Sequence, residues 1–142
     1  MGIKDILYSL TPREEQDPTA SELFIYHREI IPTSTGYSEY VVPENKLLLL
    51  HYIHVAFTQS AANLNQVYVH FAQNDVQRRF YAEVLSPGSV AFRPYTFVFN
   101  ELPIAHPRAI RAEGVWASAS GTRTVDLYVG GVLVPLGTYV RR

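Results

Sequence analysis

The residues of this 142-residue chain best suited to catalysis or metal binding are its five histidines. Two of them, His51 and His54, lie three positions apart in an apolar run that we predict to be a strand. Because successive residues of a strand face opposite sides of the sheet, these two imidazoles should point in opposite directions and should not chelate one metal ion. We therefore interpret them as core or interface histidines.

A cupin-like metalloenzyme is the alternative for these histidines. Its metal site needs two histidines on one face of a strand, a carboxylate further along the chain and another histidine near a Pro-Gly turn. Here the turn at Pro87-Gly88 is followed by Phe92 and Tyr95 where that histidine is expected. The pattern disfavours a cupin site, and we predict no metal and no cofactor.

Other catalytic signatures are also missing from the sequence. The chain has no cysteine, so a thiol nucleophile, a disulfide and a thiolate zinc site are excluded. It contains no Gly-x-Ser-x-Gly elbow, P-loop or dinucleotide fingerprint. The acids Glu83, Glu101, Glu113 and Asp126 are widely separated along the chain, and we interpret them as solvated surface charges. We expect the protein not to be an enzyme.

The run from Lys46 to Thr58 is the element that should position the two histidines. Its alternating sets are both mostly apolar, whereas a strand with one solvated face alternates apolar and polar residues. We therefore predict a central strand packed on both sides. One set is Leu47, Leu49, His51, Ile53, Val55 and Phe57, and the other is Leu48, Leu50, Tyr52, His54 and Ala56.

The remaining pattern predicts eight or nine short strands separated by turn signals. It favours an all-β fold, an antiparallel two-sheet β-sandwich that is jelly-roll-like. Pro94 indicates an edge or a bulge, and Gly130-Gly131 fits a type I′ hairpin turn. The expected strands are residues 22–31, 37–42, 46–58, 67–71, 79–84, 90–100, 109–118, 124–129, 132–134 and 137–140, with extended loop at 102–107 and a turn at 86–89.

The N-terminus carries a short apolar stripe, which predicts an N-terminal extended or short helical arm. Spacings of i, i+3, i+4 and i+7 place its residues on one side of a two-to-three-turn helix. Residues 11–21 then form a polar linker with two prolines, so we divide the chain into an arm and linker at 1–21 and a β-sandwich domain at 22–142. The arm docks either on its own domain or on a neighbouring subunit. The predicted partner-binding residues are Ile3, Ile6, Leu7 and Leu10.

The composition limits the classes of partner. Charged residues make up 18% of the chain, against about a quarter in a typical soluble protein, and hydrophobic residues 47%, so some apolar surface is expected to serve another chain. The net charge of -1 provides no basic field for nucleic acid. No apolar run reaches the 18 or so residues of a membrane helix. We expect a soluble homo-oligomer that binds neither nucleic acid nor membrane.

Exposed aromatic residues offer a second kind of interaction, because flat rings on a sandwich can stack on sugars. A glycan-binding module is therefore the alternative to an assembly protein. The candidate aromatics are Tyr52, Tyr68, Tyr81, Tyr95 and Trp116.

The segment from Tyr37 to Phe57, with its Val-Pro-Glu-Asn-Lys turn leading into a long apolar strand, resembles small jelly-roll virion proteins of tailed bacteriophages. Among these, it is most similar to capsid decoration or cement proteins. The resemblance implies a non-enzymatic structural protein of the virion, assembled in the host cytoplasm. Such a protein is often a homotrimer that binds neighbouring subunits of the major capsid protein, with the arm contributing to attachment. A head-tail connector, a baseplate component and a glycan-binding tail or fibre-associated module remain open.

Overall fold

The computed structural model describes residues 21–73, 76–85 and 91–136 of the chain. This part is all-β, as the sequence predicts. It contains the strands β1 (Ser21–Ile30), β2 (Thr35–Val41), β3 (Lys46–Gln59), β4 (Leu64–Gln73), β5 (Val76–Val84), β6 (Phe92–Ala105), β7 (Ala109–Trp116) and β8 (Arg123–Pro135).

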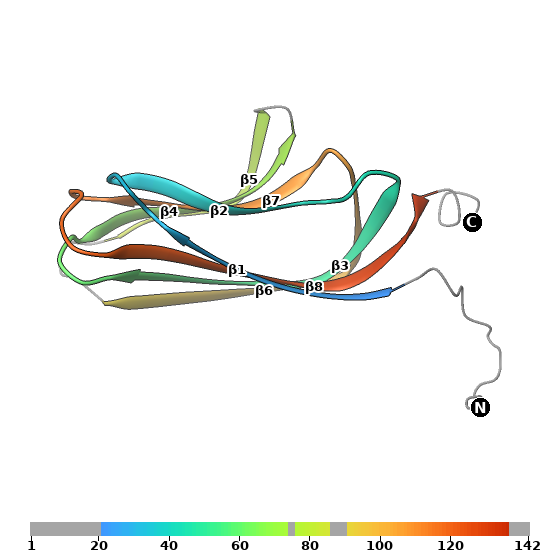
Figure 1. Ribbon diagram of the computed structural model, residues 1–142, viewed down its shortest axis with the longest axis horizontal. Helices are drawn as coiled ribbons and strands as arrows, with labels where there is room; N and C mark the ends of the chain where they lie inside the picture. Colours follow the sequence, from blue (N-terminus) through green and yellow to red (C-terminus); the bar gives the residue numbers. More distant parts are fainter. Residues whose placement is uncertain (1–20, 74–75, 86–90, 137–142) are drawn as a thin grey trace.

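The strands form two antiparallel four-stranded sheets that pack face to face as a sandwich (Figure 1). One sheet has the order β1-β8-β3-β6 and the other β2-β7-β4-β5. The pairing is nested along the chain, because β1 pairs with β8, β2 with β7, β3 with β6 and β4 with β5. The strands expected at 67–71 and 79–84, which the sequence predicts to form an antiparallel hairpin, are the innermost of these pairs, β4 and β5.

The core lies between the sheets, and β3 supplies more of its buried residues than any other described strand. Phe57 contacts Trp116 and Tyr95 edge-on, with ring centroids 6.4 and 6.0 Å apart. Burying an aliphatic or aromatic side chain of this size contributes about 1.5–3 kcal/mol. The core residues supplied by β3 are Leu48, Leu50, Ile53, Val55 and Phe57.

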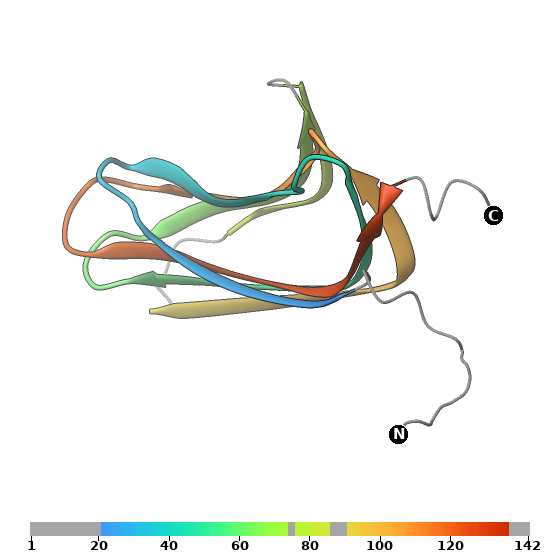
Figure 2. The same cartoon turned by 45° about the vertical axis from the view of Figure 1, so that its right-hand side comes forward.

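The predicted alternation along β3 is wrong in its first half. Core-facing residues are even-numbered up to Leu50 and odd-numbered from Ile53 onward. The register with both neighbouring strands shifts between Leu50 and Tyr52. Against β8, His51 is the extra residue of a β-bulge, whereas on β6 three residues, 99–101, lie opposite it. A bulge bends its strand, and beyond this one the ends of β3, β6 and β8 curve towards the other layer (Figure 2).

The predicted hairpin turn at Gly130-Gly131 is also wrong, because β8 runs straight through both glycines. They lie opposite the bulge of β3, with Gly130 paired to Tyr52 and Gly131 to Leu50. A Cβ atom at Gly130 would overlap the ring of Tyr52, and one at Gly131 would overlap the carbonyl oxygen of Leu49. The glycines therefore serve a close approach between strands.

β6 is an edge strand, as Pro94 suggests, but it is longer than predicted and includes residues 102–105 of the expected loop. The turn predicted at Pro43-Glu44-Asn45 is present, with Asn45 in the left-handed region at φ 62°. The helical arm with Ile3, Ile6, Leu7 and Leu10, the turn at 86–89 and the strand at 137–140 lie outside the described residues.

Candidate functional site

The outer surface of sheet β1-β8-β3-β6 exposes large apolar side chains, and we call it the apolar face. Leu23 and Ile25 of β1 pack on the core. Because side chains alternate along a strand, the even-numbered residues of β1 point outward. Phe24 is 67% exposed, and Val98, on edge strand β6, is 81% exposed. A surface of this kind marks an interaction site more often than a scattered apolar residue does. The large exposed residues on this face are Phe24, Tyr26, Ile30, Phe92 and Val98.

Aromatic rings connect the strands across this face. Tyr26 of β1 stacks on Tyr128 of β8, with ring centroids 4.7 Å apart and an interplanar angle of 25°. Tyr128 also contacts Phe24 at 6.5 Å and His54 of β3 at 5.3 Å. His54 is in turn hydrogen-bonded through Nδ1 to Thr96 Oγ1 of β6 at 2.7 Å. Cross-strand pairs of this kind fix the sheet and give the face a rigid surface.

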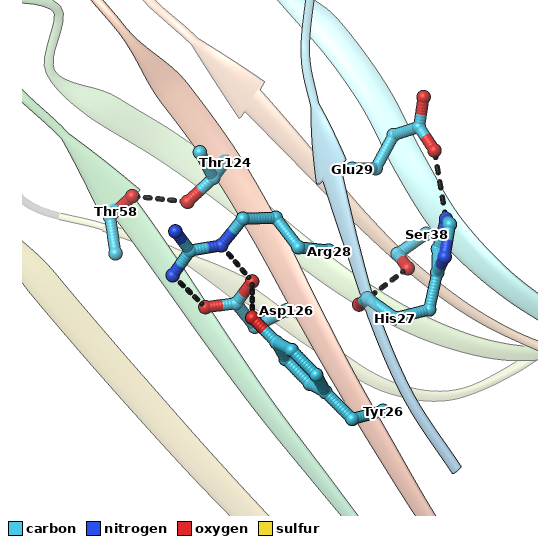
Figure 3. Close-up of polar contacts among 8 residues, drawn as sticks. All are labelled: Tyr26, His27, Arg28, Glu29, Ser38, Thr58, Thr124 and Asp126. Carbon is cyan, nitrogen blue, oxygen red and sulfur yellow. Dashed lines mark hydrogen bonds and ion pairs between the residues drawn. The ribbon is translucent and has the colours of Figure 1, made fainter.

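An ion pair stabilises the same face beside these rings (Figure 3). Arg28 Nε and Nη2 donate to the two carboxylate oxygens of Asp126 at 2.7 and 2.9 Å, and Tyr26 donates to Oδ1 at 3.3 Å. Asp126 is only 4% exposed, which overturns the expectation of a solvated charge. A buried carboxylate needs such partners, because an unpaired one would be costly to desolvate. Thr58 and Thr124 share a hydrogen bond on the neighbouring strands.

Ion pairs cross the outer surface of the other sheet, β2-β7-β4-β5, and we call it the charged face. It also exposes large apolar side chains, those of Tyr37, Val41 and Val84. Arg111 donates to Glu39 Oε2 through Nε and Nη2, at 3.0 and 2.6 Å. His70, which is fully buried, contacts Glu113 Oε1 through Nε2 at 3.1 Å. This hydrogen bond from His70 is the main cause that holds the pKa of the Glu113 carboxyl below its usual value. The two faces therefore differ in their balance of apolar and charged side chains.

A hollow of about 560 Å³ opens at one end of the apolar face. It lies between β1 and β3, where β8 has no side chains at the adjacent residues Gly130 and Gly131. Beside it, Glu101 of β6 lies 3.5 Å from His51 Nε2. We call it the glycine hollow, and its lining residues are Glu22, Leu23, Phe24, His51, Tyr52 and Gly131.

The structure separates the aromatics predicted as a sugar platform. Trp116 is 2% exposed and belongs to the core, so it is not a surface residue. Tyr81 and Tyr95 pack against the core as well and donate to Glu83 at 3.0 and 2.6 Å. Tyr68 lies on the charged face beneath Arg79. Among these candidates, Tyr52 lies beside a hollow that described residues form on the apolar face.

The prediction for the two histidines needs a correction. His51 shares the glycine hollow with its neighbour Tyr52, whose side chain faces outward like that of His54. The bulge at His51 thus turns it to the outer side, and the two imidazoles are not on opposite faces. They have separate partners, Glu101 and Thr96. In the described part of the chain, no three side chains of the metal-binding types are grouped to hold an ion.

The described segments also contain no helix that is long and apolar enough to cross a membrane. The Arg28–Asp126 pair and the glycine hollow could not be predicted from the sequence, because both depend on strand register. The signal that was available for the hollow is the Gly-Gly pair inside a β-rich run, which is compatible with a turn or with a close strand contact.

Comparisons with known proteins do not assign this chain to a family. No protein-family model matches it, and no curated protein matches it at a significant level.

Proposed function

We propose that this protein is a structural component of a bacteriophage virion that decorates the capsid, binding neighbouring capsid subunits and stabilising the shell. The apolar face is the observation that carries the proposal. Large apolar side chains exposed on the edge strands β1 and β6, with the stacked ring of Tyr128 on β8 between them, form a surface that gains free energy when another protein covers it.

The strand order supports a jelly-roll classification of the sandwich. Nested pairing of β1 with β8, β2 with β7, β3 with β6 and β4 with β5 is the arrangement of one long hairpin rolled into two sheets. Jelly rolls occur in viral capsid proteins, in lectins and in cupins. The fold alone therefore does not choose among these functions.

The contrast between the two faces favours a protein partner on one side. On the charged face, acidic and basic side chains satisfy each other, for example Glu39 with Arg111. On the apolar face, Ile30 and Phe92 have large exposed surfaces. We infer that the apolar face contacts other protein chains, both copies of this chain and shell subunits, and that the charged face is directed towards solvent.

The N-terminal arm belongs to the same attachment surface. Strand β1 begins at Ser21 and presents Phe24 on the apolar face three residues later. Ten linker residues before Ser21, residues 11–20, span at most about 33–36 Å when extended. The stripe of Ile3, Ile6, Leu7 and Leu10 can therefore reach a shell subunit that lies against this face.

Immunogold labelling of phage particles tests this proposal. Antibodies raised against the purified chain should label the heads of particles produced from the genome that encodes it. Changing Leu7 and Leu10 to Asp should remove most head label without reducing the amount of soluble protein. Label confined to tails, or particles without any label, would overturn the capsid assignment.

A further inference from the structure

Three departures from regular strand geometry meet at one end of the apolar face. Where β3 has the single bulge residue His51, β6 has three residues, 99–101, and Glu101 adopts a left-handed φ of 51°. On the other side of β3, Gly130 and Gly131 of β8 pair with the residues that flank His51. Bulges and strained backbone are found preferentially at functional sites.

Together these irregularities build the glycine hollow. The bulge brings His51 and Tyr52 to one wall, strand β1 supplies Glu22 and Phe24 to the other, and Gly131 contributes to the lining between them. The volume of about 560 Å³ falls within the range of roughly 300–1,000 Å³ that is usual for ligand pockets. The hollow is thus large enough for a small ring.

We propose that the glycine hollow binds a neutral saccharide. Phe24 and Tyr52 offer aromatic rings on which the apolar C–H face of a sugar can pack. The Glu22 carboxylate accepts hydrogen bonds, whereas an imidazole and a phenol both donate and accept them. Sugar hydroxyls need this mixture, because each is a donor and an acceptor at once.

Charge at the hollow narrows the class of ligand. Glu22 lines it, and Glu101 lies 3.5 Å from His51 beside it. Two carboxylates repel a sialylated or phosphorylated glycan. The neighbouring rings of Tyr26 and Tyr128, with Tyr128 6.5 Å from Phe24, extend the aromatic surface beyond the hollow. We therefore expect neutral oligosaccharides to bind better than single sugars.

A glycan array carrying neutral and sialylated oligosaccharides, probed with the full chain, tests this inference. Neutral glycans should bind, and titration calorimetry with the strongest of them should show at least tenfold weaker binding for Phe24→Ala and for Glu22→Gln. Phe92→Ala is the matched control, because Phe92 is exposed on the same face but pairs with Thr58, at the other end of β3. Its affinity should equal that of the unchanged chain.

Several outcomes would overturn the site. They are the absence of binding to every neutral glycan, binding of sialylated glycans alone, and equal effects of Phe24→Ala and Phe92→Ala. Thermal melting of each variant checks that it is folded, which is expected because both phenylalanines are exposed. The experiment uses the isolated chain, so a failure here leaves the capsid proposal to its own test. Ile30 and Phe92, away from the hollow, stay free for contact with the shell.

Discussion

Individual residues on the apolar face are held in place by polar contacts, and Asp126 is the clearest case. Its carboxylate is buried and receives two hydrogen bonds from Arg28 and one from Tyr26. A hydrogen bond to a charged group typically contributes about 1.5–3 kcal/mol to the free energy of unfolding. We expect Asp126→Asn to lower the free energy of unfolding by about 1–3 kcal/mol, measured by urea denaturation.

Glu44→Gln is the control for this prediction, because the Glu44 side chain is 80% exposed. It should leave the free energy of unfolding unchanged. If both substitutions have the same effect, then the Arg28–Asp126 pair does not stabilise the sheet.

Glu113 on the charged face should make stability depend on pH. Its pKa in the folded state lies below the ordinary value of 4.5, chiefly because of the hydrogen bond from His70. A lowered pKa contributes stability that is present above pH 4.5 and is lost as the pH falls through the folded-state pKa. The difference in unfolding free energy between the unchanged chain and Glu113→Gln should therefore shrink from pH 6 to pH 3, a range of ~3 pH units. A constant difference across that range would contradict the prediction.

Among the elements, the bulge in β3 and the glycines in β8 depend on each other, because the glycines leave room for the ring of Tyr52. Gly130→Ala places a methyl group where the ring of Tyr52 lies, and overpacking of this kind typically costs about 1–3 kcal/mol. Replacing Tyr52 by Ala in the same chain should recover most of that loss. A double-mutant cycle by thermal or urea unfolding measures the coupling. Additive effects would show that the ring and the glycine do not share this contact.

The elements could be predicted from sequence to the extent that they depend on local pattern. The strand at 46–58, the β4–β5 hairpin and the turn at Asn45 follow from apolar runs and turn residues. The bulge at His51 could not be predicted, because an extra residue is defined only against the neighbouring strands. For the same reason, the predictions of a turn at Gly130-Gly131 and of opposite faces for His51 and His54 are wrong: both depend on the register between β3 and β8. The expectation that Trp116 is exposed is wrong, because it lies on the core side of β7 with Ile110 and Ala112.

For the molecule as a whole, we propose different roles for the two outer faces of the sandwich. Ion pairs such as that of Arg111 with Glu39 cross the charged face, and we propose that other protein chains cover the apolar face. The glycine hollow occupies only one end of the apolar face. Assembly and sugar binding can therefore be separated by substitutions at opposite ends of β1, at Ile30 and at Phe24.

The mass of the purified chain in solution, measured by light scattering during size-exclusion chromatography, tests whether the apolar face joins protein chains. We expect a homo-oligomer, and a trimer in particular, that Ile30→Asp converts to monomers. Val84→Asp, which changes a residue 77% exposed on β5 in the other sheet, should retain the trimer. A chain that is monomeric at every concentration, or a trimer that Ile30→Asp leaves intact, would contradict the claim that the apolar face joins protein chains.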